Sequence, residues 1–250
     1  MNILAIETTG PLASVAIIND KQEIREKHSD RKLSHLQNLI PMIGDLLEDC
    51  QLQLSNLTHI AVSEGPGSFT GIRIGAATGK ALAQVLNLPV IAVPTLRAFA
   101  YNIPDFDGLF CPIFDARRSQ VYAGAYYLEN GKCLQAVPDS AYSIDVFLDR
   151  VEEFDREYGK KIIFFGDGID VYKDAVEAWK INTKRISPKD DSSVIIAEDD
   201  VRLQTASSVA RLAYELYRQG SVINYFELMP VYLRKAEAER KLEEKQAKVK

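Results

Sequence analysis

A glycine-rich segment between a short apolar strand and a helix constrains this chain more than any other feature. The strand is predicted over 59–63, and the loop 65–68 follows it directly. The next helix carries small residues at every fourth position, which places them on one face: Gly71, Gly75, Gly79 and Ala83. Glycine inside a helix costs roughly 0.5 to 1 kcal/mol relative to alanine, so the repeat predicts that another backbone lies close to this face. That neighbour is either the chain's own sheet or a partner protein.

Two phosphate-binding motifs resemble this segment and are excluded by their context. The spacing in 65–71 imitates a dinucleotide fingerprint, but the strand before it is about the fourth of the chain. The next strand, 90–93, ends in Pro94-Thr95 without an acidic residue for a ribose hydroxyl. The segment 75–81 imitates a phosphate loop, but its glycine spacing is wrong and Ala81 stands where Ser or Thr must hold magnesium.

Composition describes an ordinary globular protein. The chain has 250 residues, of which 46% are hydrophobic, so it can bury one large core or two smaller ones. Its net charge of -5 argues against strong autonomous binding to nucleic acid. Cys50, Cys111 and Cys133 form no Cys-x-x-Cys pair, which favours free thiols in a reducing compartment. The chain begins as a strand over 2–6 without a basic leader or long apolar run, so we expect a cytoplasmic protein without a membrane span.

The first part of the chain predicts three strands, a helix, a strand, a helix and a further strand. The strands are expected over 2–7, 13–18, 21–27, 59–63 and 90–93. Apolar residues at helical spacing predict the first helix over 36–50, with Ser34 and Gln37 as a capping box and Pro41 as a kink. The small-residue helix is expected to end near Leu86.

A second unit repeats this order after the turn-rich join at 104–108. Its expected strands, 109–115, 120–127 and 132–136, precede a helix over 144–158 capped by Ser143 and a strand over 161–165. Two copies of βββαβ predict an α/β protein with the duplicated fold of actin, Hsp70 and sugar kinases. We expect one subdomain from 1–104 plus a returning helix at about 205–220, a second at 105–204, and a C-terminal segment with a charged tail at 221–250. The tail is expected to be solvated, with a partner-docking arm as the alternative.

A few polar residues could carry chemistry. Glu7 and Asp115 each follow a strand and precede a turn, where a carboxylate could orient a hydrated magnesium ion, so they are weak candidates for nucleotide binding. Arg117 and Arg118 could face a phosphate or a partner's carboxylate, and a merely exposed hairpin charge is equally plausible. His35 is expected to be a surface or interface residue rather than a base. No Ser/His/Asp arrangement can be argued from the spacing.

Several motifs together resemble the TsaB family, also called YeaZ, of the bacterial tRNA threonylcarbamoyladenosine machinery. They lie in order along the whole chain, at 3–9, 39–42, 65–75, 115–118 and 230–234. One departure is Glu7-Thr8-Thr9, where such chains commonly read Asp-Thr-Ser. Because an acidic residue and a hydroxyl residue remain, this departure does little to weaken the resemblance.

The resemblance implies a subunit without a metal site or cofactor of its own. The catalytic relative, TsaD, carries a His-x-x-x-His metal pair, and the matching positions here are Thr95 and Phe99. Phenylalanine cannot bind a metal, and the three histidines of the chain are scattered at 28, 35 and 59. No catalytic residue is therefore expected.

By the same resemblance, the chain pairs with TsaD and supports threonylcarbamoyl transfer to the adenosine next to the anticodon. TsaE docks on this heterodimer, tRNA is reached through the complex, and ATP and the metal belong to the partner subunit. A homodimer is the alternative when the partner is absent. The expected interface residues lie on the first-subdomain helices: His35, Leu36, Leu39, Gly71, Ile72, Gly75 and Gly79.

Two other functions remain as alternatives. The first is a stand-alone ATP-dependent small-molecule kinase or nucleotide-binding protein of the actin-like superfamily. The second is an endopeptidase, which would need a metal or nucleophile site that the sequence does not show.

Overall fold

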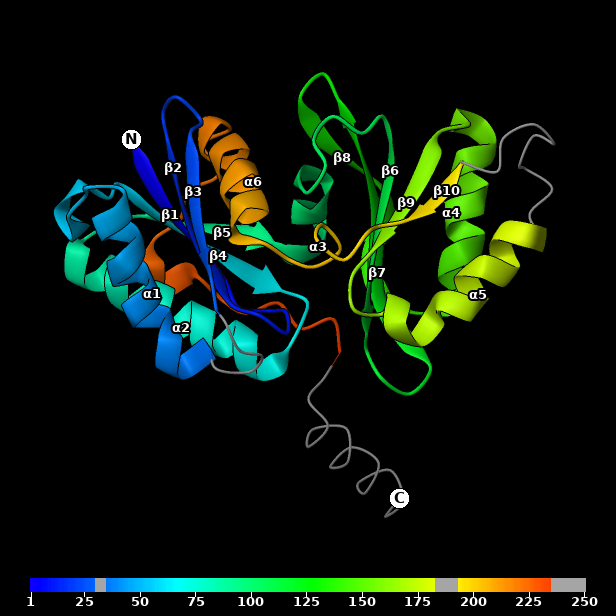
Figure 1. Ribbon diagram of the computed structural model, residues 1–250, viewed down its shortest axis with the longest axis horizontal. Helices are drawn as coiled ribbons and strands as arrows, with labels where there is room; N and C mark the ends of the chain where they lie inside the picture. The colour runs from blue at the N-terminus through cyan, green and yellow to red at the C-terminus, as the bar shows by residue number, and fades with distance from the viewer. Residues whose placement is uncertain (30–34, 183–192, 235–250) are drawn as a thin grey trace, which may run out of the picture.

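The computed structural model describes residues 1–29, 35–182 and 193–234, without the side chains of residues 35–37, 157, 158 and 182. Two units lie side by side, and each contains a five-stranded sheet with helices packed on it (Figure 1). The predicted capping pair is not described, because Ser34 and the Gln37 side chain lie outside the described part of the chain, as does the charged tail 235–250. None of the described helices is long and apolar enough to cross a membrane.

The first sheet has the strand order β3-β2-β1-β4-β5. Its strands are β1 (Asn2–Glu7), β2 (Ser14–Asn19), β3 (Ile24–His28), β4 (His59–Gly65) and β5 (Val90–Pro94). The pairs β1–β2 and β2–β3 are antiparallel, whereas β1–β4 and β4–β5 are parallel. The third strand starts three residues later than expected because the Asn19 side chain closes a turn by accepting hydrogen bonds from the backbone N–H groups of Lys21 and Glu23.

The second sheet repeats this arrangement strand for strand, in the order β8-β7-β6-β9-β10. Its strands are β6 (Gly108–Asp115), β7 (Gln120–Glu129), β8 (Lys132–Ser143), β9 (Lys161–Phe165) and β10 (Val194–Ile196). The first three strands again pair antiparallel, and β6–β9 and β9–β10 are parallel. The repeated topology confirms the duplicated actin, Hsp70 and sugar-kinase fold predicted from the sequence.

Helices cover both faces of the first sheet. The helices α1 (His35–Asp49) and α2 (Phe69–Leu86) pack on one face, and α6 (Ala206–Arg218) packs on the other. Alternate β1 residues point to opposite faces, as expected for a strand: Leu4 and Ile6 join the core under α1 and α2, whereas Ile3 and Ala5 join the core under α6. Short η1 (Leu54–Asn56) precedes β4.

The second sheet has α4 (Ile144–Tyr158) and α5 (Ile169–Asn182) on one face. Its other face holds the segment that links the units, α3 (Thr95–Ala98) and η2 (Phe99–Tyr101). The linker therefore packs on the second unit, while α6, which follows β10, returns to the first. Ser143 caps α4 as predicted, because its side chain accepts a hydrogen bond from Val146 N–H.

Residues 222–234, here called the C-terminal strap, run along the first unit and end against the second (Figure 1). Ile223 forms a bridge to Val90 at the edge of the first sheet, and Leu228 is fully buried in the core beneath α1 and α2. The strap also includes η3 (Tyr225–Glu227). At its end, the Arg234 guanidinium donates a hydrogen bond to the Ala116 carbonyl at 2.8 Å.

Candidate functional site

Glu7 lies at the end of β1 and is fully buried. One carboxylate oxygen accepts hydrogen bonds from the Thr9 backbone N–H at 2.5 Å and the Thr9 hydroxyl at 2.6 Å, and the other accepts one from the Ser63 hydroxyl. Burial raises the pKa of Glu7, and these hydrogen bonds partly offset the rise. Both oxygens are therefore engaged by the chain itself, which does not fit the ligand of an open magnesium site.

Asp115 occupies the equivalent place at the end of β6. Its carboxylate accepts a hydrogen bond from the Arg117 backbone N–H at 2.8 Å, two residues on, as Glu7 does from Thr9. The duplication thus gives both units a carboxylate that closes the turn after the first strand. In the part of the chain that the structure describes, no group of three or more His, Cys, Asp and Glu side chains is placed to hold a metal.

The glycine loop after β4 is filled by the chain's own atoms. A Cβ at Gly67 would lie 2.6 Å from the Cβ of Thr9, and one at Gly65 would lie 2.5 Å from the Val231 carbonyl oxygen. The Gly65 N–H donates to the Thr95 hydroxyl at 3.1 Å. Because these glycines have no side chains, Thr9 and the strap pack directly against them and fill the loop. A phosphate group therefore does not fit there.

The glycine face of α2 packs on the chain's own first sheet. A Cβ at Gly71 or Gly75 would overlap atoms of Thr8, and one at Gly79 would overlap the Val62 side chain. The Thr8 hydroxyl donates to the Gly71 carbonyl at 2.7 Å, which joins the β1–β2 turn to the helix. The prediction that Gly71, Gly75 and Gly79 meet a partner is therefore wrong.

Two other predicted interface residues are also internal. Leu39 and Ile72 are each 1% exposed, so a partner cannot reach them without unpacking the first unit. Their apolar side chains serve the packing of α1 and α2 instead. The side chains of His35 and Leu36 are outside the described residues, and their interface role stays a prediction.

The opposite face of α2 is exposed and also carries small residues. Arg73, Ala77, Ala81 and Val85 lie two positions on from the buried repeat, about 200° around the helix, and all four are exposed. On the neighbouring α1, a Cβ at Gly44 would have no atom within 4 Å. The signal is present in the sequence, because Ala77 and Ala81 form a second run of small residues, two positions on from Gly75 and Gly79.

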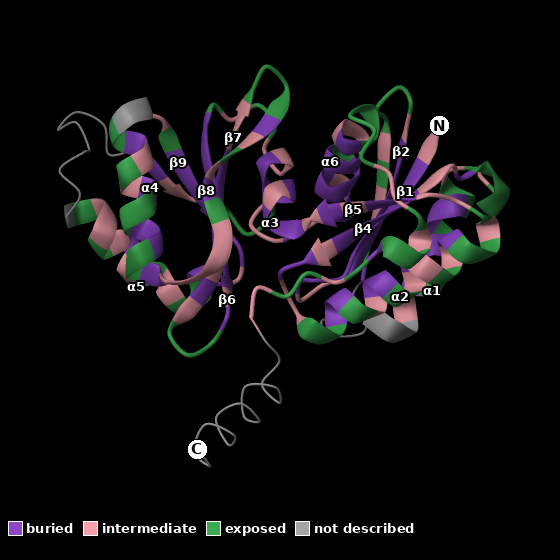
Figure 2. Cartoon of the chain, turned by 180° about the vertical axis from the view of Figure 1, so that it is seen from behind, coloured by how far each residue is buried: buried purple, intermediate pink, exposed green. Residues whose placement is uncertain are grey.

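Exposed hydrophobic residues are frequent on α1, α2 and the C-terminal strap. The exposed stretches of both helices are green in Figure 2. Among the described residues, twelve large hydrophobic side chains are exposed, and seven of them lie on α1, α2 or the C-terminal strap. These seven are Ile40, Phe69, Val85, Phe226, Met229, Val231 and Tyr232. Because apolar side chains scattered singly need no explanation but a gathering does, this surface is the leading candidate for a protein contact.

Thr95 and Phe99 are parts of the core that joins the two units. Each is 1% exposed, and the Thr95 hydroxyl accepts the hydrogen bond from Gly65. The Phe99 ring packs against Phe114 and Phe165, with ring centroids 5.5 and 5.6 Å away. Both side chains therefore take part in the packing of this core.

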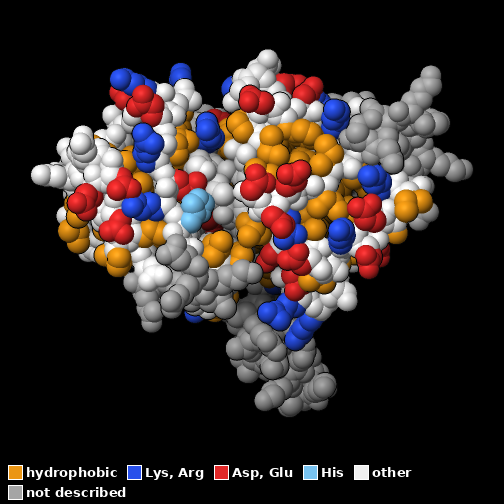
Figure 3. All heavy atoms as spheres, in the orientation of Figure 1, with side chains coloured by type: hydrophobic (Ala, Val, Ile, Leu, Met, Phe, Trp, Pro, Cys, Tyr) orange, Lys and Arg blue, Asp and Glu red, His pale blue; other side chains and the backbone are white. Residues whose placement is uncertain are grey.

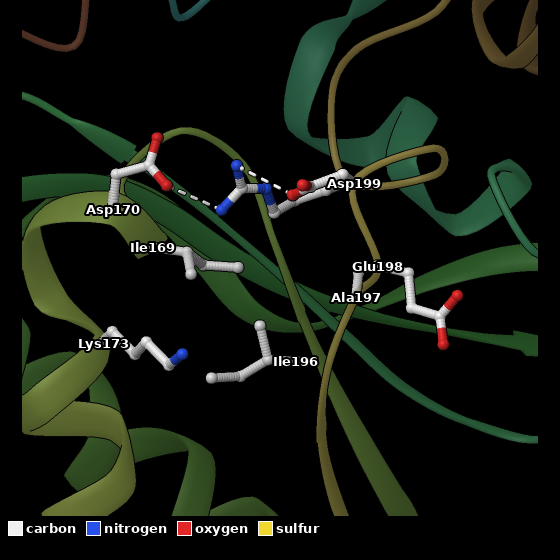
Figure 4. Close-up of a pocket in the computed structure, with 8 residues that line it drawn as sticks. Ile169, Asp170, Lys173, Ile196, Ala197, Glu198 and Asp199 are labelled. Carbon is white, nitrogen blue, oxygen red and sulfur yellow. Dashed lines mark hydrogen bonds and ion pairs between the residues drawn. The ribbon is translucent and has the colours of Figure 1, made fainter.

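A surface pocket of about 540 Å³ lies elsewhere, between the start of α5 and residues 196–202 (Figure 4). Its arginine, Arg202, is paired with Asp170 at 2.7 Å and Asp199 at 3.2 Å. The guanidinium charge is therefore already neutralised within the chain. No residue singled out from the sequence lines this pocket.

The buried Glu7 predicts a measurable pH dependence. Because its pKa is raised in the folded protein, the stability it contributes is fully present below its ordinary value of 4.5 and is lost as pH rises through the raised pKa. We expect the free energy of unfolding of the natural chain to fall with pH relative to Glu7→Gln, measured by urea denaturation. The exposed Glu48→Gln serves as control, and parallel pH profiles for all three proteins would contradict the expectation.

Comparison with known proteins gives consistent matches over nearly the whole chain. The family model described as TsaD, tRNA N6-adenosine threonylcarbamoyltransferase, matches residues 29–242. The tRNA threonylcarbamoyladenosine biosynthesis protein TsaB of Bacillus subtilis is 35% identical over 98% of this chain and 100% of its own. The protein of the same name from Escherichia coli is 28% identical over 97% of this chain and 98% of its own.

The fold agrees with these matches. A crystal structure described as an uncharacterized protein with similarity to peptidase YEAZ from Pseudomonas aeruginosa superposes with a TM-score of 0.74 at 26% identity. The superposition covers 93% of this chain and 99% of that one. YeaZ from Pseudomonas aeruginosa gives a TM-score of 0.71 over the same shares. The chain therefore belongs to the TsaB family of tRNA threonylcarbamoyladenosine biosynthesis proteins and is related in sequence to the TsaD threonylcarbamoyltransferase.

Proposed function

We propose that this chain is a non-catalytic subunit that pairs with TsaD and supports threonylcarbamoyl transfer to the adenosine next to the anticodon. The observation that carries the pairing is the exposed face of α2, where Ala77 and Ala81 stand among the exposed hydrophobic side chains of α1, α2 and the strap. Small side chains let a second helix approach closely, and the surrounding apolar side chains supply area to bury.

The non-catalytic part of the proposal is supported by what the candidate chemical residues do instead. Thr95 and Phe99 are packed in the core, Glu7 is enclosed by Thr9 and Ser63, and Asp115 closes its own turn. The same contacts disfavour the stand-alone kinase, since the glycine loop offers no place for a phosphate.

In this proposal the ATP and the metal belong to TsaD, TsaE docks on the heterodimer, and tRNA is reached through the complex, in the cytoplasm. Because TsaD is related in sequence, its corresponding helices could oppose α1 and α2 about a near two-fold axis. The same face would pair two copies of this chain when TsaD is absent.

Co-purification from the native cell tests the proposal. A tagged chain at its natural level should bring down TsaD in near-equal amount, with TsaE present when ATP is included. Recovery of the tagged chain without TsaD, from cells shown to contain TsaD, would contradict the pairing.

A further inference from the structure

We propose that the β6–β7 turn, together with the arginine that the C-terminal strap brings to it, binds phosphate groups of the tRNA backbone. The proposed surface consists of Arg117, Arg118 and Arg234. It rests on the proposed function to the extent that the chain must work in a complex that holds tRNA. Arg117 and Arg118 belong to the β6–β7 turn of the second unit, whereas Ala77 and Ala81 belong to α2 of the first unit, so variants of the two surfaces can be tested separately.

The turn itself is held in an unusual backbone conformation. Arg117, Arg118 and Ser119 are consecutive non-glycine residues with φ of 60°, 58° and 58°, in the left-handed region that L-residues seldom adopt. Asp115 stabilises this turn through its hydrogen bond to the Arg117 N–H. Strain of this kind persists where the surrounding structure imposes it, and it is frequent at binding sites. Its effect here is to present two exposed arginines at the tip of a short turn.

Arg234 reaches the same turn from the other end of the sequence. Its Nη1 donates to the Ala116 carbonyl at 2.8 Å and to the Arg117 carbonyl at 3.4 Å. The strap is fixed on the first unit by buried Leu228 and by the hydrogen bond from Val231 N–H to the Glu64 carbonyl, 2.7 Å long. Both described hydrogen bonds of Arg234 use Nη1, and a guanidinium has five N–H donors, so it can hold the turn and still face an acceptor.

Phosphate is the acceptor that this arrangement fits best. Guanidinium groups bind phosphate oxygens in paired hydrogen bonds. Here Arg234 holds the backbone of the turn that carries the exposed Arg117 and Arg118, so one turn brings together three arginines from two segments far apart in the sequence. The family acts on tRNA, which supplies closely spaced phosphates. The net charge of -5 and the mixed charges seen on the surface in Figure 3 give no broad basic field. Asp115 and Asp167, which repel each other nearby, oppose binding as well. Binding at this turn should therefore be local and add to the affinity that the complex provides.

The test is the salt dependence of tRNA binding by the purified complex of this chain with TsaD. An unmodified tRNA transcript is titrated by fluorescence anisotropy between about 50 and 300 mM salt, after size-exclusion chromatography has shown that the complex forms. Removing one phosphate-binding arginine should lower the slope of log K against log salt by about one unit. We expect Arg117→Ala with Arg118→Ala to lower the slope by about two units and to weaken binding roughly tenfold per arginine near 0.1 M salt.

Two controls define the outcome. Arg211→Ala with Arg218→Ala removes the same charge from exposed positions on α6, and Arg117→Lys with Arg118→Lys keeps the charge of the turn. Both should keep the slope of the natural chain. An unchanged slope in the alanine variant of the turn, or an equal fall in the α6 control, would overturn the proposal. The proposal would also be overturned if the alanine variant of the turn bound tRNA normally but no longer bound fluorescent ADP. The arginines would then serve a nucleotide site.

The chromatography separates this inference from the pairing with TsaD. Complex formation with an unchanged slope would refute only the tRNA surface. If no complex forms, the pairing fails, and the titration is repeated on the chain alone at about 50 mM salt and high protein concentration, where weak phosphate binding is strongest. Equal binding by the natural chain and the alanine variant of the turn under these conditions would then overturn the inference.

Discussion

Replacing Gly71 with alanine should destabilise the isolated protein by about 3 kcal/mol, a large effect for a single methyl group. The added Cβ would overlap the Thr8 backbone carbonyl oxygen, which cannot turn aside as the end of a flexible side chain can. The Thr8 hydroxyl also donates to the Gly71 carbonyl, so a shift of the helix would strain that hydrogen bond. For a chain of this size we expect the melting temperature to fall by roughly 6 to 12 °C, measured by differential scanning calorimetry.

Gly44→Ala is the matched control, because it makes the same substitution inside a helix where the new Cβ meets no atom within 4 Å. It should stabilise the protein by up to about 1 kcal/mol through helix propensity. If Gly71→Ala melted at or above the temperature of the natural chain, the inner face of α2 would not pack as described.

Placing two arginines on the outer face of α2, as Ala77→Arg with Ala81→Arg, should weaken pairing with TsaD on the order of 100-fold or more. Each change sets a long charged side chain where the proposed interface requires close helix approach, and about 1.4 kcal/mol is lost for each tenfold change in affinity. Because both alanines are exposed, the melting temperature of the isolated chain should hardly change. Isothermal titration calorimetry with purified TsaD measures the effect.

Ala178→Arg, at an exposed position on α5, is the control for added charge and bulk. It should bind TsaD as the natural chain does. Unchanged affinity in the Ala77 and Ala81 variant would remove the outer face of α2 from the proposed interface.

The sequence predicted that α2 needs a close neighbour, but not which neighbour. Small residues occur at 71, 75 and 79 and also at 77 and 81, so both faces of the helix carry them. Periodicity identifies faces, whereas only the tertiary structure shows that Thr8 and Val62 fill the space against the glycines. The cost of glycine correctly indicated close backbone packing, and the error was to assign that packing to a partner.

The unpredicted strand β10 and the length of β8 also depend on information that local sequence lacks. The three residues of β10 are too few to show a period of two, and they follow a segment outside the described residues. The strand β8 runs to Ser143 rather than 136 because it pairs along the length of β7, a contact that local sequence does not reveal. For the same reason, Arg234 could not be placed beside Ala116 from the sequence, since 118 residues separate them.

The sequence placed Glu7 and Asp115 correctly but did not decide what their carboxylates do. The sequence placed both at strand ends before turns, and the structure has them there. Their hydrogen bonds to Thr9 and Arg117 show that each carboxylate closes its own turn. A carboxylate at a strand end is chemically suited to either role, and the packing around it decides between them.

The central claim is that this chain supports threonylcarbamoyladenosine formation by pairing with TsaD. The most direct test measures this nucleoside in bulk tRNA, by liquid chromatography and mass spectrometry, after the chain is depleted from its native cell. The modification should be lost, should return with the natural chain or with Ala178→Arg, and should stay low with Ala77→Arg and Ala81→Arg expressed at the same level. A normal nucleoside profile after verified depletion, or full rescue by the double variant, would contradict the claim.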